Sequence, residues 1–216
     1  MRAGPTSTLW VVADQAFTVG FDLDLTLADT RRGIAAVFTV LSAETGVFID
    51  TAAVVARLGP PLETELAYWY PAAEIPAMAA RYRELYAGIA VPETVAMPGA
   101  VRAVDEVRAA GGRVMVVTAK NQRDAERTVR FLGLPVDVVV GALFGAEKGR
   151  ALRDHAAAAY VGDHTADVDA ARAGGALSVG VATGPYDAAA LQAYGADVVL
   201  ADLLAFPGWL AGHRAA

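Results

Sequence analysis

The chain has 216 residues, 55% of them hydrophobic, but no uninterrupted apolar run approaches the ~18 residues of a membrane-spanning helix. Eighteen basic against 24 acidic residues give a net charge of −6, which argues against a nucleic-acid-binding protein with a basic surface stripe. Cysteine is absent, so disulfide bonds, thiol nucleophiles and thiolate metal sites are excluded. The first residues lack the apolar core of a secretory signal, and we expect a cytoplasmic protein.

The predicted elements begin with one strand and continue with helices alone. Residues 17–21 form the first predicted strand, whereas residues 9–13 fit either a strand or a helix. Between residues 30 and 96 no stretch is a convincing strand, and the apolar spacing predicts helices. These helices are expected near residues 31–45, 51–58, 62–69 and 73–89, with a break at Gly59-Pro60-Pro61.

From residue 98 onward, helices and strands alternate. Helices are expected at residues 100–110, 121–132, 148–157, 166–173 and 187–194, and strands at residues 113–117, 136–140, 159–161, 176–181 and 197–200. Continuous apolar strands separated by short helices are typical of a parallel sheet buried on both faces. We therefore expect an α/β core of Rossmann-like type, formed by residues 1–29 and 97–216, with an inserted all-helical unit at residues 30–96.

Chemically active side chains follow several of these strands. Ligands of open parallel sheets bind beyond the carboxyl ends of the strands, so such residues are candidates for a site. Four acids, one hydroxyl group and one lysine are expected at this edge: Asp22, Asp24, Asp163, Asp167, Thr118 and Lys148. Their convergence on one edge is the strongest functional signal in the sequence.

The residue types at this edge suit a divalent cation and a phosphate group. Asp22 and Asp24 are two positions apart in an extended segment, so their side chains point the same way and repel each other. With Asp163 nearby, such oxygen ligands are those that Mg²⁺ prefers. The Lys148 ammonium group and the Thr118 hydroxyl group would bind phosphate oxygens.

Each signal also has a simpler structural interpretation when it is taken alone. Residues 22–26 fit a turn with a helix cap, Thr118 fits a helix N-cap, and Gly162-Asp163 fits an ordinary turn. Lys148 fits less well, because a cation near a helix N-terminus opposes the helix dipole. The occurrence of all of them in order at strand ends favours a functional site.

The motifs resemble those of the haloacid dehalogenase-like (HAD) superfamily, in its phosphatase branch. Its first motif, Asp-x-Asp-x-Thr, matches Asp22-Leu23-Asp24-Leu25-Thr26, and its second and third match Thr118 and Lys148. Its fourth matches Gly162-Asp163 together with Asp167. The resemblance extends from Phe17 to about Leu200 and is closest to phosphoglycolate phosphatase-like members, in which the helical insert is a C1 cap. Many relatives have Gly where this chain has Leu25, and haloacid dehalogenases themselves lack the second Asp.

The resemblance implies a role for each matched residue. Asp22 would attack phosphorus and form an aspartyl-phosphate, and Asp24 would act as general acid and then as general base. Mg²⁺ would be bound by the Asp22 carboxylate, the Asp24 main-chain carbonyl and the Asp163 carboxylate. The remaining matched positions would hold the phosphate (Thr118, Ala119 and Lys148) or support the metal site without binding the ion (Asp167).

The insert carries candidate residues for substrate selection. The segment Gly59-Pro60-Pro61-Leu62 is the best candidate for a loop that reaches the active site, although it also fits a plain helix connection. Arginines 57, 81 and 83 fit solvated helix faces better than contacts with an acidic leaving group. The aromatic residues between 68 and 86 are expected to form the insert's own core, and His164 is expected to be a solvent-exposed loop residue.

The resulting prediction is a Mg²⁺-dependent phosphatase that acts on a small phosphorylated metabolite, as a monomer or homodimer, without nucleic-acid or membrane partners. A phosphomutase or phosphotransferase would use the same core. A receiver-like phospho-acceptor signalling domain also combines an acidic pocket with Thr and Lys, but it would not have the long insert. A phosphonatase would be expected to supply a lysine from its cap, and residues 30–96 contain none.

Overall fold

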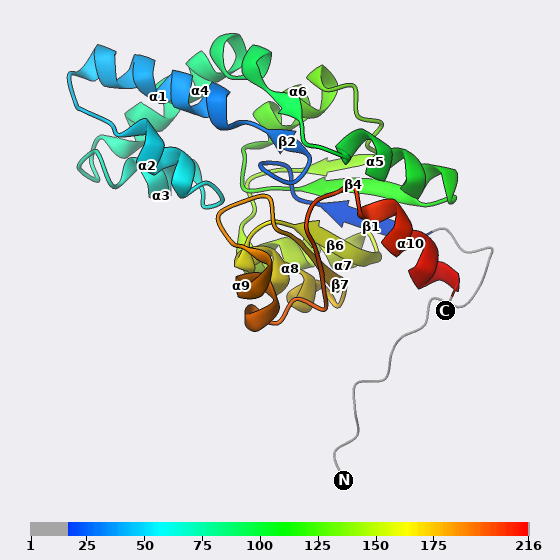
Figure 1. The fold of residues 1–216 in the computed structure, drawn as a ribbon. Helices are drawn as coiled ribbons and strands as arrows, with labels where there is room; N and C mark the ends of the chain where they lie inside the picture. The colour runs from blue at the N-terminus through cyan, green and yellow to red at the C-terminus, as the bar shows by residue number, and fades with distance from the viewer. Residues whose placement is uncertain (1–16, 216) are drawn as a thin grey trace.

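A computed structural model describes residues 17–215, and the open choice at residues 9–13 lies outside this range. Its centre is a six-stranded parallel sheet with the order β5-β4-β1-β6-β7-β8 (Figure 1). The strands are β1 (Thr18–Phe21), β4 (Arg113–Val117), β5 (Val138–Val140), β6 (Ala157–Gly162), β7 (Leu177–Val181) and β8 (Val198–Leu200). The predicted α/β fold with a parallel sheet is confirmed.

Helices cover both faces of this sheet. One apolar layer joins the sheet to α5 (Ala100–Ala109), α6 (Gln122–Phe131) and α10 (Phe206–Ala215). The layer on the other face includes side chains of α7 (Lys148–Asp154) and α8 (Thr165–Gly174). A short 3₁₀ helix, η2 (Gly145–Glu147), precedes α7, and α9 (Ala188–Tyr194) connects β7 to β8. Among the described residues, no helix is long and apolar enough to cross a membrane.

Four helices form an insertion after β1 with an apolar core of its own. They are α1 (Arg31–Thr45), α2 (Thr51–Ala56), α3 (Leu62–Leu66) and α4 (Ile75–Ile89), followed by the 3₁₀ helix η1 (Val91–Glu93). In Figure 1 they stand together to one side of the sheet. The insertion begins and ends near a two-stranded antiparallel pair, β2 (Ala28–Asp29) and β3 (Val95–Ala96). The expectation of no strand between residues 30 and 96 was therefore wrong for β3.

The sheet order determines which loops meet. β1 lies between β4 and β6, and Phe21 at its end pairs with Val116 and Val161. The segments that follow β1, β4 and β6 therefore leave the sheet side by side at one edge. This edge carries the loops that contain Asp22, Thr118 and Asp163.

Candidate active site

Three buried carboxylates gather where β1 and β6 end. Asp22 follows β1 directly, and its main-chain N–H donates to the Val161 carbonyl at 2.8 Å. Asp163 follows β6, and Asp167 lies in the first turn of α8. One carboxylate oxygen from each acid lies within 4.8 Å of the others, and all three residues are buried. This arrangement is one that can hold a metal ion.

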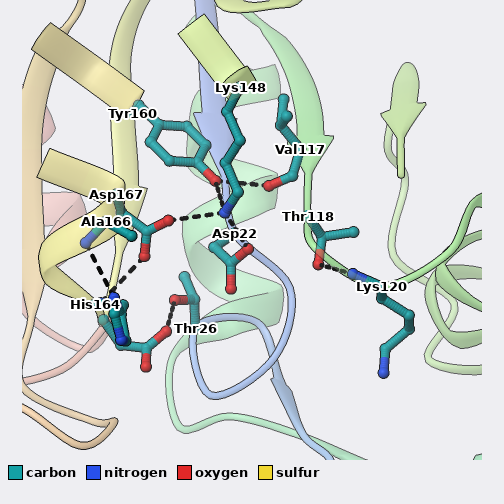
Figure 2. Close-up of polar contacts among 11 residues, drawn as sticks. Asp22, Thr26, Val117, Thr118, Lys120, Lys148, Tyr160, His164, Ala166 and Asp167 are labelled. Carbon is teal, nitrogen blue, oxygen red and sulfur yellow. Dashed lines mark hydrogen bonds and ion pairs between the residues drawn. The ribbon is translucent and has the colours of Figure 1, made fainter. Parts of the chain in front are cut away.

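Lys148, at the start of α7, ties two of these acids together. Its Nζ donates to Asp22 Oδ1 at 2.7 Å, to Asp167 Oδ1 at 2.8 Å and to the Tyr160 hydroxyl group at 2.8 Å (Figure 2). The Tyr160 hydroxyl in turn donates to the Val117 carbonyl at 2.6 Å. With its side chain only 3% exposed, Lys148 is held by the edge of the sheet itself.

Burial and the proximity of like charges shift the pKa values of the cluster. Burial raises the pKa of Asp22 to about 7, against the lowering effect of Lys148. Burial and the charges of Asp167 and Asp22 raise the pKa of Asp163 well above its usual value. Burial lowers the pKa of Lys148, but Asp167 and Asp22 outweigh it and keep that pKa high. Three carboxylates against one ammonium group leave a formal surplus of two negative charges, which a divalent cation would balance.

The backbone around the acids is held tightly. The Thr26 hydroxyl group donates to Asp163 Oδ1 at 2.8 Å, and the Thr183 hydroxyl group donates to the Leu25 carbonyl at 2.6 Å. A Cβ atom at Gly184 would collide with the Asp163 carboxylate, so this wall leaves no room for a side chain. Leu25 has a φ of 61°, in the left-handed region that favours glycine, at a cost of about 1–2 kcal/mol.

Asp24 is not one of the three clustered acids, and its carboxylate has other partners. Its carboxylate accepts from the Thr30 hydroxyl group at 2.5 Å and pairs with Lys120 Nζ at 3.1 Å. The Lys120 side chain is 8% exposed, and its Nζ lies 4.5 Å from the centre of the Tyr86 ring on α4. Burial lowers the pKa of Lys120, but Asp24 and Tyr86 hold it above its usual value. Sequence reasoning missed this lysine, although its place just after the β4 strand end is a usable signal.

Thr118 and Ala119 begin the loop after β4. The buried Thr118 hydroxyl group accepts from the Lys120 N–H at 3.2 Å, and Figure 2 shows both residues on the side of Asp22 opposite to Asp167. The cap of α6 is Asn121, whose side chain accepts from the Asp124 N–H. The interpretation of Thr118 as that helix's N-cap is therefore wrong.

His164 is half-buried, so the expectation of a solvent-exposed loop residue was wrong. Its Nδ1 accepts from the Ala166 N–H at 3.0 Å and caps α8. Its ring meets Phe144 and Tyr186 edge-on, at centroid distances of 5.8 Å and 4.8 Å. Burial lowers the pKa of His164. The capping role and the two ring contacts explain why this side chain is not free in solvent.

A cavity separates the helical insertion from the loop after β4. Gly59, Pro60 and Leu62 line it from the insertion, and Asp24, Ala119 and Lys120 line it from the core. A Cβ atom at Gly59 would lie 2.7 Å from the His164 ring, so the predicted selectivity loop approaches the loop after β6. Pro61 precedes α3 as its N-cap residue and is not part of the lining.

The arginine and aromatic residues of the insertion divide into two groups. Arg57 and Arg83 line the cavity, whereas Arg81 binds Glu44 and Glu84 on the surface. Most of the aromatic residues lie in or against the insertion's core, as expected: Tyr70, Tyr82, Tyr86 and the partly buried Trp69. Tyr68 is the exception, since it is 63% exposed and lies at the cavity.

Comparisons with known proteins agree on one family. The model of the family described as haloacid dehalogenase-like hydrolase matches residues 19–172. A protein named "Phosphoglycolate phosphatase" from Caulobacter vibrioides is 28% identical, over 88% of this chain and 89% of its own. "Probable phosphatase IndB" from Dickeya dadantii is 30% identical, over 83% and 87%. The solved structure of a haloacid dehalogenase-like family hydrolase from Streptococcus pneumoniae is 25% identical, with a TM-score of 0.80 over 90% of this chain and 98% of that one.

Proposed function

Because the chain belongs to the haloacid dehalogenase-like hydrolase family, we propose that it is a Mg²⁺-dependent phosphatase that hydrolyses a small phosphate monoester through an aspartyl-phosphate at Asp22. The observation that carries the proposal is the ammonium group of Lys148 between Asp22 and Asp167, beside a third buried carboxylate. Such a site combines a nucleophile with charges that bind a dianion. The phosphatase names of two relatives support the same substrate class.

The chemistry assigned to the two acids of the first motif balances in two steps. An Asp22 carboxylate oxygen forms a bond to phosphorus while the bond to the ester oxygen breaks, and Asp24 gives that oxygen a proton. Asp24 then takes a proton from a water molecule that attacks the same phosphorus. The Asp22–phosphorus bond breaks and inorganic phosphate leaves, so that Asp22 is again a carboxylate and Asp24 again carries the proton with which it started. Because Asp24 lines the cavity, the alcohol would depart on that side.

The other residues of the site would bind and orient the phosphate. Lys148 holds Asp22 Oδ1, which fixes the carboxylate and leaves its second oxygen for the attack. Thr118 and the main chain of Ala119 would donate to phosphate oxygens. The Asp22 and Asp163 carboxylates, with the Asp24 carbonyl, would hold Mg²⁺, and Asp167 would support the site through Lys148. When bound, the ion would shield the Asp22 carboxylate from the charge of the phosphate.

The helical insertion would act as a cap on this site. We assign residues 1–29 and 97–216 to the catalytic core and residues 30–96 to the cap. The separate apolar cores of the two parts support this division. A cap excludes water from the reacting atoms and selects the leaving group.

Metal removal tests the proposal. The purified protein is expected to hydrolyse p-nitrophenyl phosphate with Mg²⁺, to lose this turnover in excess EDTA, and to regain it when Mg²⁺ is added back, because the surplus negative charge of the site needs a cation. Release of inorganic phosphate, measured alongside, distinguishes hydrolysis from phosphoryl transfer to a second substrate. Undiminished turnover in excess EDTA would refute the metal assignment.

A further inference from the structure

The cavity beside Asp24 sets a size for the leaving group. Its volume is about 120 Å³, and it opens between the cap and the loop that carries Ala119 and Lys120. A buried cavity of about 150 Å³ accommodates a benzene ring, so this space suits an alcohol with a single small ring or a short branched chain. Asp22 and Lys148 do not line it, so this space is additional to the phosphate site.

The cap side of the cavity is mostly apolar. Aliphatic and aromatic side chains from α1, α2, the loop after α2 and the start of α3 line it, among them Ile34, Phe38, Val54, Leu58 and Leu62. Burial of an apolar group against such a wall is favourable because it removes apolar surface from water. A strongly hydrated leaving group would gain little from these contacts.

The cations at this cavity are already paired. Arg57 donates to both carboxylate oxygens of Glu65, at 3.1 Å and 2.6 Å, and Lys120 lies 3.1 Å from Asp24. Arg83 Nη2 donates to Glu63 Oε1 at 2.5 Å. Within the described part of the chain, each lysine or arginine that lines the cavity therefore has a carboxylate partner. An anionic leaving group would have to compete with a carboxylate for its cation.

Buried polar atoms without a hydrogen-bond partner occur in two residues that line the cavity, Arg83 and Tyr86. The buried Nε of Arg83 has no hydrogen-bond partner, and Arg83 lines the cavity. Because Glu63 already balances the charge of this guanidinium group, Arg83 does not call for an anionic leaving group.

These observations point to one class of substrate. Building on the proposed function, we propose that the physiological ester carries an uncharged, largely apolar alcohol, with a single small ring or a short branched chain. Glycolate, a small anion, is the opposite kind of leaving group. Esters with apolar and with anionic leaving groups can be compared by their kcat/KM on this enzyme.

Three alkyl phosphate esters test the inference. Each releases an alkyl alcohol, whereas p-nitrophenyl phosphate releases a phenol, so the three can be compared with one another. We expect kcat/KM for 2-phenylethyl phosphate to exceed that for ethyl phosphate ~10-fold or more, from burial of the ring. We expect kcat/KM for phosphoglycolate to fall below that for ethyl phosphate. A preference for phosphoglycolate over 2-phenylethyl phosphate would overturn the inference.

A matched pair of cap variants tests the role of charge pairing. Glu65→Gln releases Arg57 at the cavity and is expected to raise the phosphoglycolate-to-ethyl phosphate ratio of kcat/KM ~10-fold. Glu44→Gln removes a carboxylate that Arg81 binds through the same two bonds; Arg81 keeps Glu84 and does not line the cavity, so the ratio should stay unchanged.

The outcomes separate this inference from the proposed function. An unchanged ratio in Glu65→Gln, or an equal rise in Glu44→Gln, would overturn the assignment of the cavity charges. If p-nitrophenyl phosphate and all three alkyl esters resisted hydrolysis in the presence of Mg²⁺, the phosphatase proposal itself would fail. If the enzyme hydrolysed these esters but preferred phosphoglycolate to 2-phenylethyl phosphate, only the inference about the leaving group would fail, and the phosphatase proposal would stand.

Discussion

Replacement of Asp22 by Asn is expected to lower kcat for p-nitrophenyl phosphate by on the order of 10³-fold or more, with the fold intact. A neutral amide has no carboxylate oxygen with which to form the acyl phosphate. The substitution keeps the shape of the side chain and removes one of three crowded buried charges. Since burial raises the pKa of Asp22 to about 7, loss of its charge should cost the folded protein little. Lys148 would retain its contacts with Asp167 and Tyr160.

The measurement pairs steady-state kinetics with thermal unfolding. Asp105 is an exposed aspartate on α5, away from the site, and Asp105→Asn is the matched control for the same chemical change. We expect the control to keep its activity and both variants to unfold near the wild-type temperature. If Asp22→Asn retained even a tenth of the wild-type kcat, the covalent route would be wrong.

Replacement of Lys148 by Met should impair both catalysis and stability. Loss of one preorganised charge that stabilises the transferring phosphoryl group is expected to lower kcat/KM by about 10²–10³-fold. The same change leaves Asp22 and Asp167 buried without their shared cation, and removal of one partner of a buried ion pair costs about 3–5 kcal/mol of unfolding free energy. Tyr160 would keep its bond to the Val117 carbonyl.

A second cationic side chain on α7, that of Arg150, provides the control for the loss of a positive charge. Arg150 is 85% exposed in its side chain and lies near Asp154, so Arg150→Met should change the unfolding free energy by less than about 0.5 kcal/mol and leave kinetics unchanged. Urea denaturation and kcat/KM measured on both variants make the comparison. Wild-type kinetics in Lys148→Met would remove this residue from the proposed site.

Much of the core could be predicted because its signals are local. The apolar run that ends at Val117 and the glycines before it are typical of a buried strand, and the structure places β4 at residues 113–117 as predicted. Similar runs predicted the other long strands to within two or three residues. The insertion was visible because its apolar residues follow a helical period, and α1 begins and ends where predicted, at Arg31 and Thr45.

The elements that were missed depend on contacts far away in sequence. β2 and β3 have two residues each, too few for an alternating pattern, and they exist because Asp29 and Val95 pair across the base of the insertion. The helix α10 was not predicted, although Pro207 near its start is a usable signal. Its first residue, Phe206, is fully buried and packs on Phe21 at a centroid distance of 5.4 Å.

In the candidate site, too, some features could be predicted from the sequence and others could not. The acids were predictable because strand ends of a parallel sheet meet at one edge, and Asp22, Asp163 and Asp167 do lie together. The partners of the lysines were not predictable, because they depend on side-chain geometry. Lys148 bridges Asp22 and Asp167, whereas Lys120 pairs with Asp24 and lies against Tyr86 of the helical insertion. Under the proposed function, these pairings separate the phosphate site from the cavity for the leaving group.

Trapping the phosphorylated enzyme tests the central claim most directly. The protein is quenched in acid during turnover with Mg²⁺ and an alkyl ester, any acyl phosphate is reduced with borohydride, and the peptides are mapped by mass spectrometry. Reduction of an aspartyl-phosphate converts that residue to homoserine, and the account predicts this change at Asp22 alone. Steady turnover with an unmodified Asp22, or with the phosphoryl group on another residue, would contradict it.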